Sequence, residues 1–284
     1  MKRKQSIVSC TSLFVLVIFA LPGQIRASVT HWQADLGNWS DSLNWDAGEP
    51  DSAVYAILDN GGTAEITLSG EQCLGFTATY GTVNMSSGSL ITAGCLDIGY
   101  AGTADFIQSG GALTLNDQMF IGISQGFGRY SISGGTLEVA EDRDVFVGMP
   151  DPEFWGTGQF TVTGAQSSIE IGGSFELSTL STLNSQINQQ GISAINVSGW
   201  AAMDGSWSVV ALGDVPLGRF DVLTADTIDA SFKAVYLPDA DWNWGVDYGT
   251  AGAPDVLWIE HVPEPTTFLL LATGGLFLRK RGKS

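Results

Sequence analysis

The segment GTVNMSSGSLITAGCLDIGYAG, residues 81–102, is followed by two segments that repeat its order of features. These are ADFIQSGGALTLNDQMFIGISQGFG, residues 104–128, and RYSISGGTLEVAEDRDVFVGMP, residues 129–150. Each reads as a strand, a Ser-Gly corner, a second strand, a corner of variable length, and a third strand that ends in Ile-Gly or Val-Gly. A weaker copy, QFTVTGAQSSIEIGGSFELS, occupies residues 159–178.

The spacing of these copies predicts the architecture. The Ser-Gly pairs stand at 87–88, 109–110 and 133–134, and the closing pairs stand at 98–99, 121–122 and 147–148. A period of roughly 23 residues, with alternating apolar residues such as Leu113 and Leu137, suits one coil of a parallel β-solenoid. We therefore expect an all-β, right-handed parallel β-helix, with coils ~4.8 Å apart. An antiparallel β-sandwich with hairpin turns at similar intervals is the alternative.

The two ends of the body depart from the repeat. Residues 31–51 contain three tryptophans (Trp32, Trp39 and Trp45) among glycine and proline. They suggest an aromatic cap over the open end of the first coil, because an uncovered rung exposes unpaired backbone. The alternative is a platform on which sugars stack. We expect a cap and first coil over 28–80, solenoid repeats over 81–182, and a β-rich C-terminal region and cap over 183–261, which could instead be a separate sandwich.

Two cysteines remain in the predicted mature chain, Cys73 and Cys95. Their separation is close to one period of the repeat, so they could occupy equivalent inward positions on adjacent coils. An exported chain permits a disulfide between them, whereas stacked buried thiols are also acceptable as small apolar side chains. We slightly favour the disulfide.

The charge of the body limits its partners. Between Ser28 and Pro263 there are four cations and twenty-nine Asp and Glu residues. This balance argues against nucleic acid, whose phosphates require clustered Lys and Arg. It suits divalent cations, but Asp142, Asp144 and Asp151 are only weak Ca²⁺ candidates, because they lack the spacing of a calcium loop. A solvated acidic face is the simpler interpretation, so no cofactor is required, although Ca²⁺ is allowed.

The N-terminal segment 1–27 has the features of a secretory signal peptide. A basic head (Lys2, Arg3, Lys4) precedes an apolar stretch over residues 13–21, and a cleavage point follows Ala27. The stretch is short for a membrane core of ~30 Å, which disfavours an uncleaved anchor. We expect export.

Catalytic signals are weak. The histidines His31 and His261 lie near opposite ends of the mature chain, and the GISQG stretch at 122–126 falls at a repeat corner, outside the strand-to-helix turn that a hydrolase serine needs. The better enzymatic rival is a glycan-cleaving solenoid with carboxylates from neighbouring coils. Its residues would be Asp117, Asp142 and Asp144, with Arg143 beside them. Acidic residues are so common here that we expect no catalytic site.

The C-terminal segment 262–284, VPEPTTFLLLATGGLFLRKRGKS, forms a separate unit. The two prolines interrupt regular structure, the stretch 266–278 forms a short apolar run, and a basic end follows (Arg279, Lys280, Arg281, Lys283). By the positive-inside rule this end stays cytoplasmic and the body lies outside. An ordinary C-terminal anchor is the alternative.

This tail closely resembles the PEP-CTERM sorting signal of Gram-negative bacteria, with its motif at Val262, Pro263, Glu264 and Pro265. The resemblance implies recognition by an exosortase, a membrane cysteine protease that cuts near the motif. It also implies transient anchoring in the inner membrane by a single C-terminal transmembrane segment. Delivery would be to the envelope, the cell surface or the extracellular polysaccharide matrix.

The body also resembles the β-solenoid passenger regions of secreted bacterial proteins. The similarity lies in G-x-W-S-D-x-x-N-W, which runs from Gly37 to Trp45. It carries fold information and no defined activity. We therefore expect a non-enzymatic surface or matrix protein, structural or adhesive in a biofilm or envelope, with extracellular polysaccharide as a candidate partner. The alternative is an exported polysaccharide hydrolase or lyase on the same scaffold.

Overall fold

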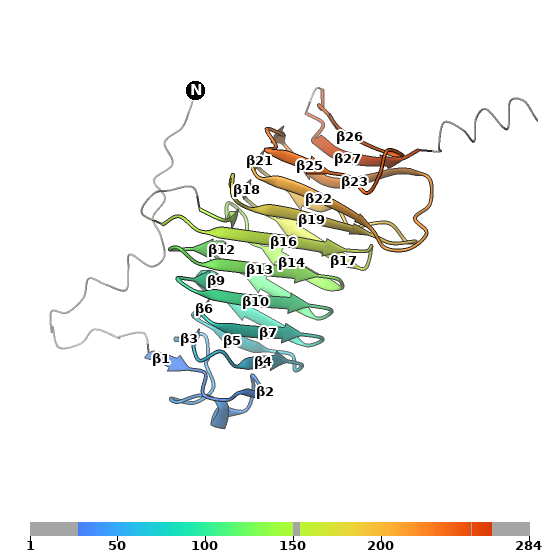
Figure 1. The fold of residues 1–284 in the computed structure, drawn as a ribbon. Coiled ribbons are helices and arrows are strands. Elements are labelled where there is room, and N and C mark those ends of the chain that lie inside the picture. Colours follow the sequence, from blue (N-terminus) through green and yellow to red (C-terminus); the bar gives the residue numbers. More distant parts are fainter. Residues whose placement is uncertain (1–27, 150–153, 251, 263–284) are drawn as a thin grey trace, which may run out of the picture.

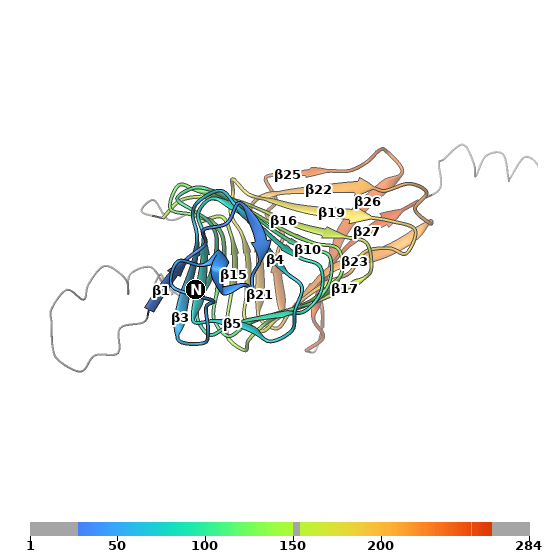
Figure 2. The same ribbon diagram turned by 90° about the horizontal axis from the view of Figure 1, so that it is seen from below.

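The computed structural model describes residues 28–149, 154–250 and 252–262. Within them, 27 strands form three nine-stranded sheets, called here sheets 1, 2 and 3. The sheets are the sides of one elongated stack of coils (Figure 1). In the view from below, the strands of successive coils lie behind one another (Figure 2).

From β3 to β23 each coil contributes one strand to each sheet, in the order sheet 1, sheet 2, sheet 3. The first coil contributes none to sheet 3, and two strands of sheet 3, β26 and β27, follow the last strands of the other two sheets. Sheet 1 contains β1 (Ser28–His31), β3 (Val54–Leu58), β6 (Gly75–Ala78), β9 (Leu96–Tyr100), β12 (Met119–Ile123), β15 (Val145–Val147), β18 (Phe175–Leu177), β21 (Trp200–Met203) and β24 (Thr227–Asp229). Sheet 2 contains β2 (Leu36–Asn38), β4 (Thr63–Ile66), β7 (Gly81–Met85), β10 (Thr103–Gln108), β13 (Phe127–Ile132), β16 (Thr157–Thr163), β19 (Thr182–Ile187), β22 (Ser206–Ala211) and β25 (Ala234–Tyr236). Sheet 3 contains β5 (Glu71–Cys73), β8 (Ser89–Thr92), β11 (Ala112–Leu115), β14 (Gly135–Val139), β17 (Ser167–Ile171), β20 (Ile195–Val197), β23 (Gly218–Ala225), β27 (Asp255–His261) and β26 (Trp242–Asp247).

The inward residues of successive coils stack in register, which confirms the parallel solenoid. Leu113 pairs with Leu90 on one side and with Leu137 on the other, and all these strands are parallel. Leu137 pairs in turn with Ile169, and every member of this column is fully buried. Each coil covers the apolar residues of its neighbour, so the stack builds one continuous core. The antiparallel sandwich is therefore wrong for this body.

A second column in the core is aromatic. Phe106, Tyr130 and Phe160 are in register, with ring centroids 5.7 and 5.2 Å apart. The buried Tyr130 hydroxyl donates a hydrogen bond to Gln108 Oε1 at 2.5 Å, and Gln108 Nε2 donates to the Thr136 carbonyl at 2.9 Å. Because a buried polar group without a partner is costly, these bonds allow a polar pair inside an apolar core.

The coils are less regular than the sequence spacing suggests. Equivalent positions at Thr77 and Asp97 are 20 residues apart in the chain, whereas Asp144 and Ser174 on neighbouring coils are 30 apart. The additional residues lie between strands, at 140–144 before β15 and in the connection from β15 to β16. The pleated strands must keep their register to remain paired, so insertions are tolerated only between them.

The closing Ile-Gly and Val-Gly pairs mark the corner between sheets 1 and 2. Gly122 has φ +78°, and a Cβ at this position would overlap the carbonyl of Thr157 on the next coil. Gly99 and Gly148 occupy the equivalent place, with φ of +74° and +71°. Only glycine combines this left-handed backbone with such a close approach of the neighbouring coil.

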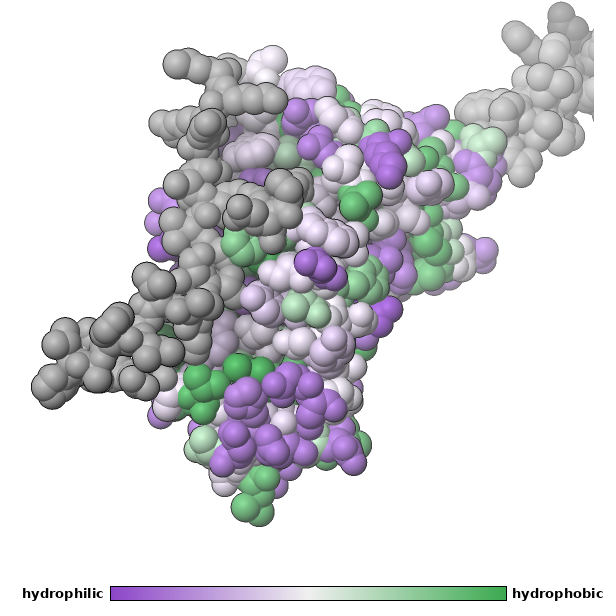
Figure 3. Space-filling view, turned by 60° about the vertical axis from the view of Figure 1, so that its left-hand side comes forward, coloured by the Kyte–Doolittle hydropathy of each residue, from purple (hydrophilic) through white to green (hydrophobic). Residues whose placement is uncertain are grey.

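The N-terminal cap is built from the three predicted tryptophans. Trp45 packs edge-on against Trp32 and Trp39, with centroids 5.0 and 4.8 Å apart, and its Nε1 donates to the Trp39 carbonyl at 2.8 Å. A 3-10 turn, η2 (Ser42–Asn44), is capped by Asp41, whose Oδ1 accepts from the Leu43 amide at 3.0 Å. The indoles are 0%, 0% and 4% exposed, so the sugar-stacking alternative is wrong for them. The rim of this end presents mainly hydrophilic residues (Figure 3).

The C-terminal region continues the solenoid and then closes it. β19, β22 and β25 pair in parallel, so a separate sandwich after residue 183 is also wrong. Sheet 3 then turns antiparallel, because β27 pairs with both β23 and β26. Trp244 of β26 packs on Trp207 and Phe232 with centroids 6.0 and 5.7 Å apart, which covers the last coil. The expected β-rich cap is present.

Candidate functional site

The acidic residues that the sequence proposed for glycan cleavage lie at the corner between sheets 3 and 1. Arg143 Nη1 is 3.7 Å from Asp117 Oδ1 on the preceding coil. Asp144 Oδ1 accepts a hydrogen bond from the Ser174 amide at 2.8 Å, so this carboxylate holds the next corner in place. Asp142 is exposed in a left-handed turn with φ +58°. The four residues thus lie at one corner, but the Asp144 carboxylate is occupied by its hydrogen bond to a backbone amide.

The same corner contains two of the residues that the sequence suggested as weak Ca²⁺ ligands. Within the described ranges, no three His, Cys, Asp or Glu side chains come together as a metal site, and Asp151 lies outside those ranges. A second acidic stretch, DADWNWGVD at 239–247, is occupied by contacts of its own: Asp239 Oδ1 accepts from the Asp241 amide at 2.9 Å, and Asp247 binds Arg219 and Trp258. The weak Ca²⁺ candidates Asp142 and Asp144 therefore do not converge on one point.

A buried carboxyl that the sequence did not indicate lies on the outward face of sheet 1. Asp97 Oδ2 accepts a hydrogen bond from Thr77 Oγ1 at 3.0 Å, and the Tyr55 hydroxyl lies 2.8 Å from the same Thr77 oxygen. Burial raises the pKa of Asp97 to about 7, although the hydrogen bonds from Thr77 and Tyr55 oppose the shift. The three residues form a polar network across three successive coils.

A second carboxyl on this face is also perturbed. Burial raises the pKa of Glu176 to about 7, and the carboxylates of Asp144 and Asp204 add to the effect. The register from Asp97 through Phe120 and Phe146 to Glu176 places the two acids three rungs apart, or ~14 Å at ~4.8 Å per rung. Paired carboxylates of glycosidases stand ~5 to 10 Å apart, so these two do not match that geometry.

Between those acids the outward face of sheet 1 is apolar. Phe120 and Phe146 stack with centroids 5.2 Å apart and an interplanar angle of 9°. They form a second hydrophobic cluster with Cys95, Ile123 and Met149, against which Tyr100 and Phe154 pack. Successive side chains of a strand point to opposite faces, and these phenylalanines point away from the core. Their odd or even position along the strand was therefore the feature of the sequence that could have indicated an outer cluster.

The predicted Cys73–Cys95 disulfide is not formed. Cys73 is a free thiol in the solenoid core, in register with Thr92, and burial raises its pKa. Cys95 belongs to the outer cluster, and its Sγ is 3.6 Å from Asp117 Oδ2. The prediction failed because the partner of Cys73 on the next coil, Thr92, precedes Cys95 in the chain. The coil is therefore shorter here than the separation of the two cysteines, and they do not occupy equivalent positions.

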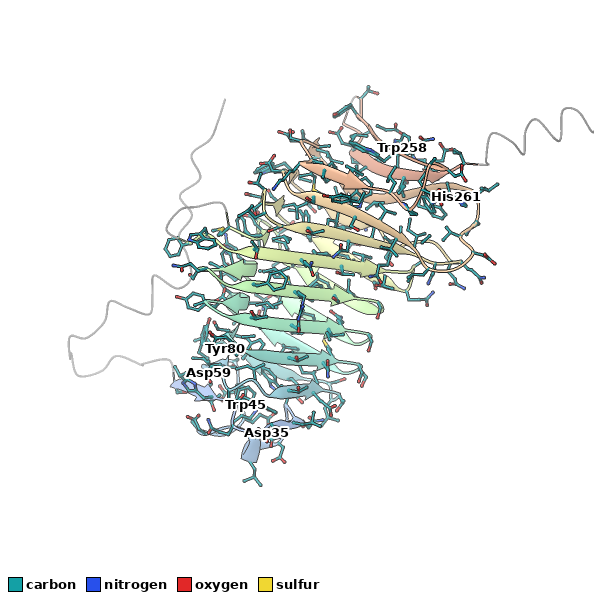
Figure 4. All side chains as sticks on the ribbon, viewed as in Figure 1. Asp35, Trp45, Asp59, Tyr80, Trp258 and His261 are labelled. Carbon is teal, nitrogen blue, oxygen red and sulfur yellow. The ribbon has the colours of Figure 1, made fainter. Side chains whose placement is uncertain are left out.

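The residues of a conventional hydrolase remain apart. His31 of β1 lies 3.1 Å from Asp59 at the N-terminal end, whereas His261 stacks on Trp242 with centroids 4.6 Å apart at the C-terminal end (Figure 4). Ser124 of the GISQG stretch has φ 55° in the turn between β12 and β13, as a turn serine should. The nucleophile, base and acid of a triad are therefore not assembled around Ser124.

The corner between sheets 1 and 2 gathers aromatic side chains, of which Tyr80 and Trp155 are exposed and Tyr100 and Phe127 are half-buried. Tyr80 precedes β7, Tyr100 ends β9, Phe127 begins β13 and Trp155 precedes β16. One aromatic residue thus stands at this corner in each of four successive coils. Tyr80 is 50% exposed and Trp155 is 46% exposed. Figure 4 places Tyr80 at the side of the stack, clear of the N-terminal cap around Trp45.

The terminal signals lie mostly beyond the described residues. Val262 is the last of them, and its amide donates to the Asp241 carbonyl at 2.8 Å, which fixes the point from which the tail leaves the C-terminal cap. The signal segment 1–27, Pro263, Glu264, Pro265 and the basic end Arg279, Lys280, Arg281 and Lys283 are outside the described ranges. No helix within those ranges is long and apolar enough to cross a membrane.

Comparison of the chain with protein families, with curated proteins and with solved structures finds no match.

Proposed function

We propose that this chain is an exported, non-catalytic protein of the cell surface or extracellular matrix, structural or adhesive in a biofilm or envelope. The observation that carries the proposal is an uninterrupted stack of parallel coils that is closed at both ends. Such a body offers long side faces for contact with other molecules. The two terminal segments supply the route, with a signal peptide for export and the VPEP tail for sorting by an exosortase.

The acidity of the body is compatible with export and with a protein that does not bind nucleic acid. The four cations of the body are Arg129, Arg143, Arg219 and Lys233, and the three arginines are each paired with Asp side chains. Few positive groups remain to hold phosphates, so contact with polymers must use hydroxyl, amide and aromatic groups. Transient anchoring in the inner membrane by residues 266–278 would precede release by the protease.

The proposal is tested by following the full chain in a Gram-negative strain that encodes an exosortase and in the same strain without it. Intact-mass measurement should show loss of residues 1–27 in both strains, and loss of the tail near 262–265 only when the exosortase is present. A Pro263→Ala, Glu264→Ala variant should keep its tail and remain with the inner membrane. An unprocessed chain in the cytosol, or identical masses in both strains, would contradict the proposal.

The enzymatic alternative has its own test. The purified exported protein is incubated with bacterial exopolysaccharides, and the soluble fraction is analysed for oligosaccharides. We expect no release of oligosaccharide, since Asp144 is engaged with the Ser174 amide. Asp97 and Glu176 in turn stand three rungs apart, too far for the usual acid and base pair. Release of oligosaccharide that Asp117→Asn or Asp144→Asn abolishes would establish the polysaccharide-active enzyme instead.

A further inference from the structure

The three corners of the solenoid differ in chemistry. Over the same four coils, the corner between sheets 2 and 3 is made of Ser, Gly, Ala and Gln, and the corner between sheets 3 and 1 is rich in Gly, Asn and Asp. Of the three, only the corner between sheets 1 and 2 carries an aromatic residue in each of these four coils. We call Tyr80, Tyr100, Phe127 and Trp155 the aromatic corner.

Each end of the aromatic corner is supported by an adjacent coil. The Tyr80 ring lies against the backbone of Gly102, where a side chain would meet the ring at 2.9 Å. The Trp155 carbonyl accepts a hydrogen bond from the Gln125 amide at 2.5 Å, which fixes its segment to the preceding coil. About half of each side chain still faces solvent, although burying an aromatic ring is strongly favourable. Half-exposed aromatic rings on a fixed backbone are typical of recognition surfaces.

Polar groups that can bind hydroxyls stand beside the rings. Arg129 places its guanidinium 5.5 Å from the centre of the Phe127 ring and donates hydrogen bonds to Asp105 from Nε to Oδ1 and from Nη2 to Oδ2, the latter at 2.7 Å. Gln159 is in register with Arg129 on the next coil. Aromatic faces for the C–H side of a ring, flanked by fixed donors and acceptors, are what a pyranose requires.

The spacing and the charge narrow the class of ligand. Successive coils are ~4.8 Å apart, and Tyr80 lies two rungs before Phe127 in the same column. Trp155 lies one rung after Phe127, two residues before Thr157, which is the residue in register with Phe127. This staggered series suits an extended polymer that runs along the stack. The strongly acidic body repels polyanions, and the one cation of the corner, Arg129, is neutralised by Asp105. A neutral chain is the complementary choice.

We propose that the aromatic corner binds a neutral linear polysaccharide, with Tyr80, Phe127 and Trp155 stacking on its sugar rings. This inference rests on the proposed function, since it names the polymer that an exported adhesive body would hold. A purely structural role for the rings predicts no retention by neutral polymers and is the outcome against which the proposal is measured.

The test is affinity electrophoresis of the exported protein in native gels that contain hydroxyethyl cellulose, mannan or xylan, with alginate as the acidic polymer. We expect at least one neutral polymer to retard the protein and alginate to leave its mobility unchanged. Tyr80→Ala and Trp155→Ala should each weaken the retardation constant several-fold, and the double variant should lower it by about tenfold or more, equivalent to ~1.4 kcal/mol.

Matched controls distinguish binding at this site from non-specific binding through exposed aromatic side chains. Trp200 on β21 and Tyr236 on β25 are 39% and 61% exposed away from the aromatic corner, so Trp200→Ala and Tyr236→Ala should keep full retardation. Unchanged circular dichroism establishes that each variant is folded. Retardation by none of the three neutral polymers, or equal losses in test and control variants, would overturn the inference. Processing by the exosortase is measured independently, so the proposed function can stand when this inference fails.

Discussion

The two ends of this solenoid cover the open core of the terminal coil in different ways. At the N-terminal end, sheets 1 and 2 simply begin with short edge strands, and three buried indoles in an irregular loop cover the core. At the C-terminal end, sheet 3 changes direction, and the antiparallel strands β27 and β26 lay Trp242 and Trp244 over the last coil. The first cap depends on side-chain packing and the second on backbone pairing.

The two caps also differ in their electrostatics. At the N-terminal end, burial raises the pKa of Glu71 to about 7, and the nearby carboxyl of Glu49 adds to the shift. At the C-terminal end, Arg219 and the Trp258 indole hold the pKa of Asp247 below its usual value. The carboxyl near the N-terminal cap therefore favours its neutral form and the one in the C-terminal cap its charged form.

The greatest loss of stability that we expect concerns packing in the N-terminal cap. Trp39 is fully buried and touches both Trp45 and Phe76, with centroids 4.8 and 5.2 Å away. Trp39→Ala should lower the free energy of unfolding by ~3–5 kcal/mol, because it leaves a cavity under the cap. Urea unfolding measures the loss. Leu43→Ala in the same loop, where the side chain is 87% exposed, is the control and should change little. Equal, small effects of both variants would show that the indoles do not hold this end.

A somewhat smaller effect tests the backbone pairing of the C-terminal cap. The buried carboxylate of Asp255 accepts hydrogen bonds from the Ile228 and Gly249 amides, both at 2.8 Å, and so joins β27 to β24 and to the turn before it. Asp255→Asn removes one acceptor and should cost ~1–3 kcal/mol in thermal or urea unfolding. Asp214→Asn, in an exposed turn, serves for comparison. A variant as stable as the parent would mean that β27 is held by its strand pairing alone.

The stability of the two caps should depend on pH in different ranges. The folded-state pKa of Glu71 is raised, so the folded state binds its proton more tightly than the unfolded state does. The N-terminal cap should therefore be firmest at mildly acid pH and loosen as pH rises through about 7. The lowered pKa of Asp247 stabilises the C-terminal cap above its ordinary pKa, and this contribution is lost only in stronger acid.

Hydrogen exchange measures this difference. Between about pH 5.5 and about pH 8, corrected exchange should rise over residues 31–50 and stay level over residues 255–261. Glu71→Gln should remove the change at the N-terminal end. A parallel rise at both ends in the parent protein would show that neither acid controls its own cap.

The weakest effect should come from the exposed ion pairs of the C-terminal cap. Arg219 binds Asp221 at 3.0 Å and Asp247, and its guanidinium lies 5.1 Å from the centre of the Trp258 ring. Arg219→Ala should reduce the thermal midpoint less than Asp255→Asn does, because solvent and salt screen exposed pairs. Adding salt should erase the remaining difference from the parent. A loss as large as that of Trp39→Ala would reverse the ranking of the two caps.

The candidate sites were less predictable than the fold. The aromatic corner does not show in the aligned repeats, because Tyr80 and Trp155 lie outside the repeated segments and their exposure is not given by a sequence. The burial of Asp97 was not predictable either. Alternation places this residue on an outward face, where a carboxylate is expected to be solvated. Only the register that puts Thr77 beside it shows a buried, hydrogen-bonded acid.

The stacked coils of this protein follow from local sequence alone. Alternating apolar residues such as Leu113 and Leu137, with glycine at each corner, leave few other ways to bury the chain. Which residues became partners across coils was settled only in the folded stack. The fold put Cys73 beside Thr92 and away from Cys95, stacked Phe120 on Phe146 outside the core, and turned β27 antiparallel. The cysteine offset depends on how many residues the corners of that coil contain, and a corner can gain or lose residues without changing the pattern of the strands that it joins. The other two depend on which strands meet across the stack, which the folded chain alone decides.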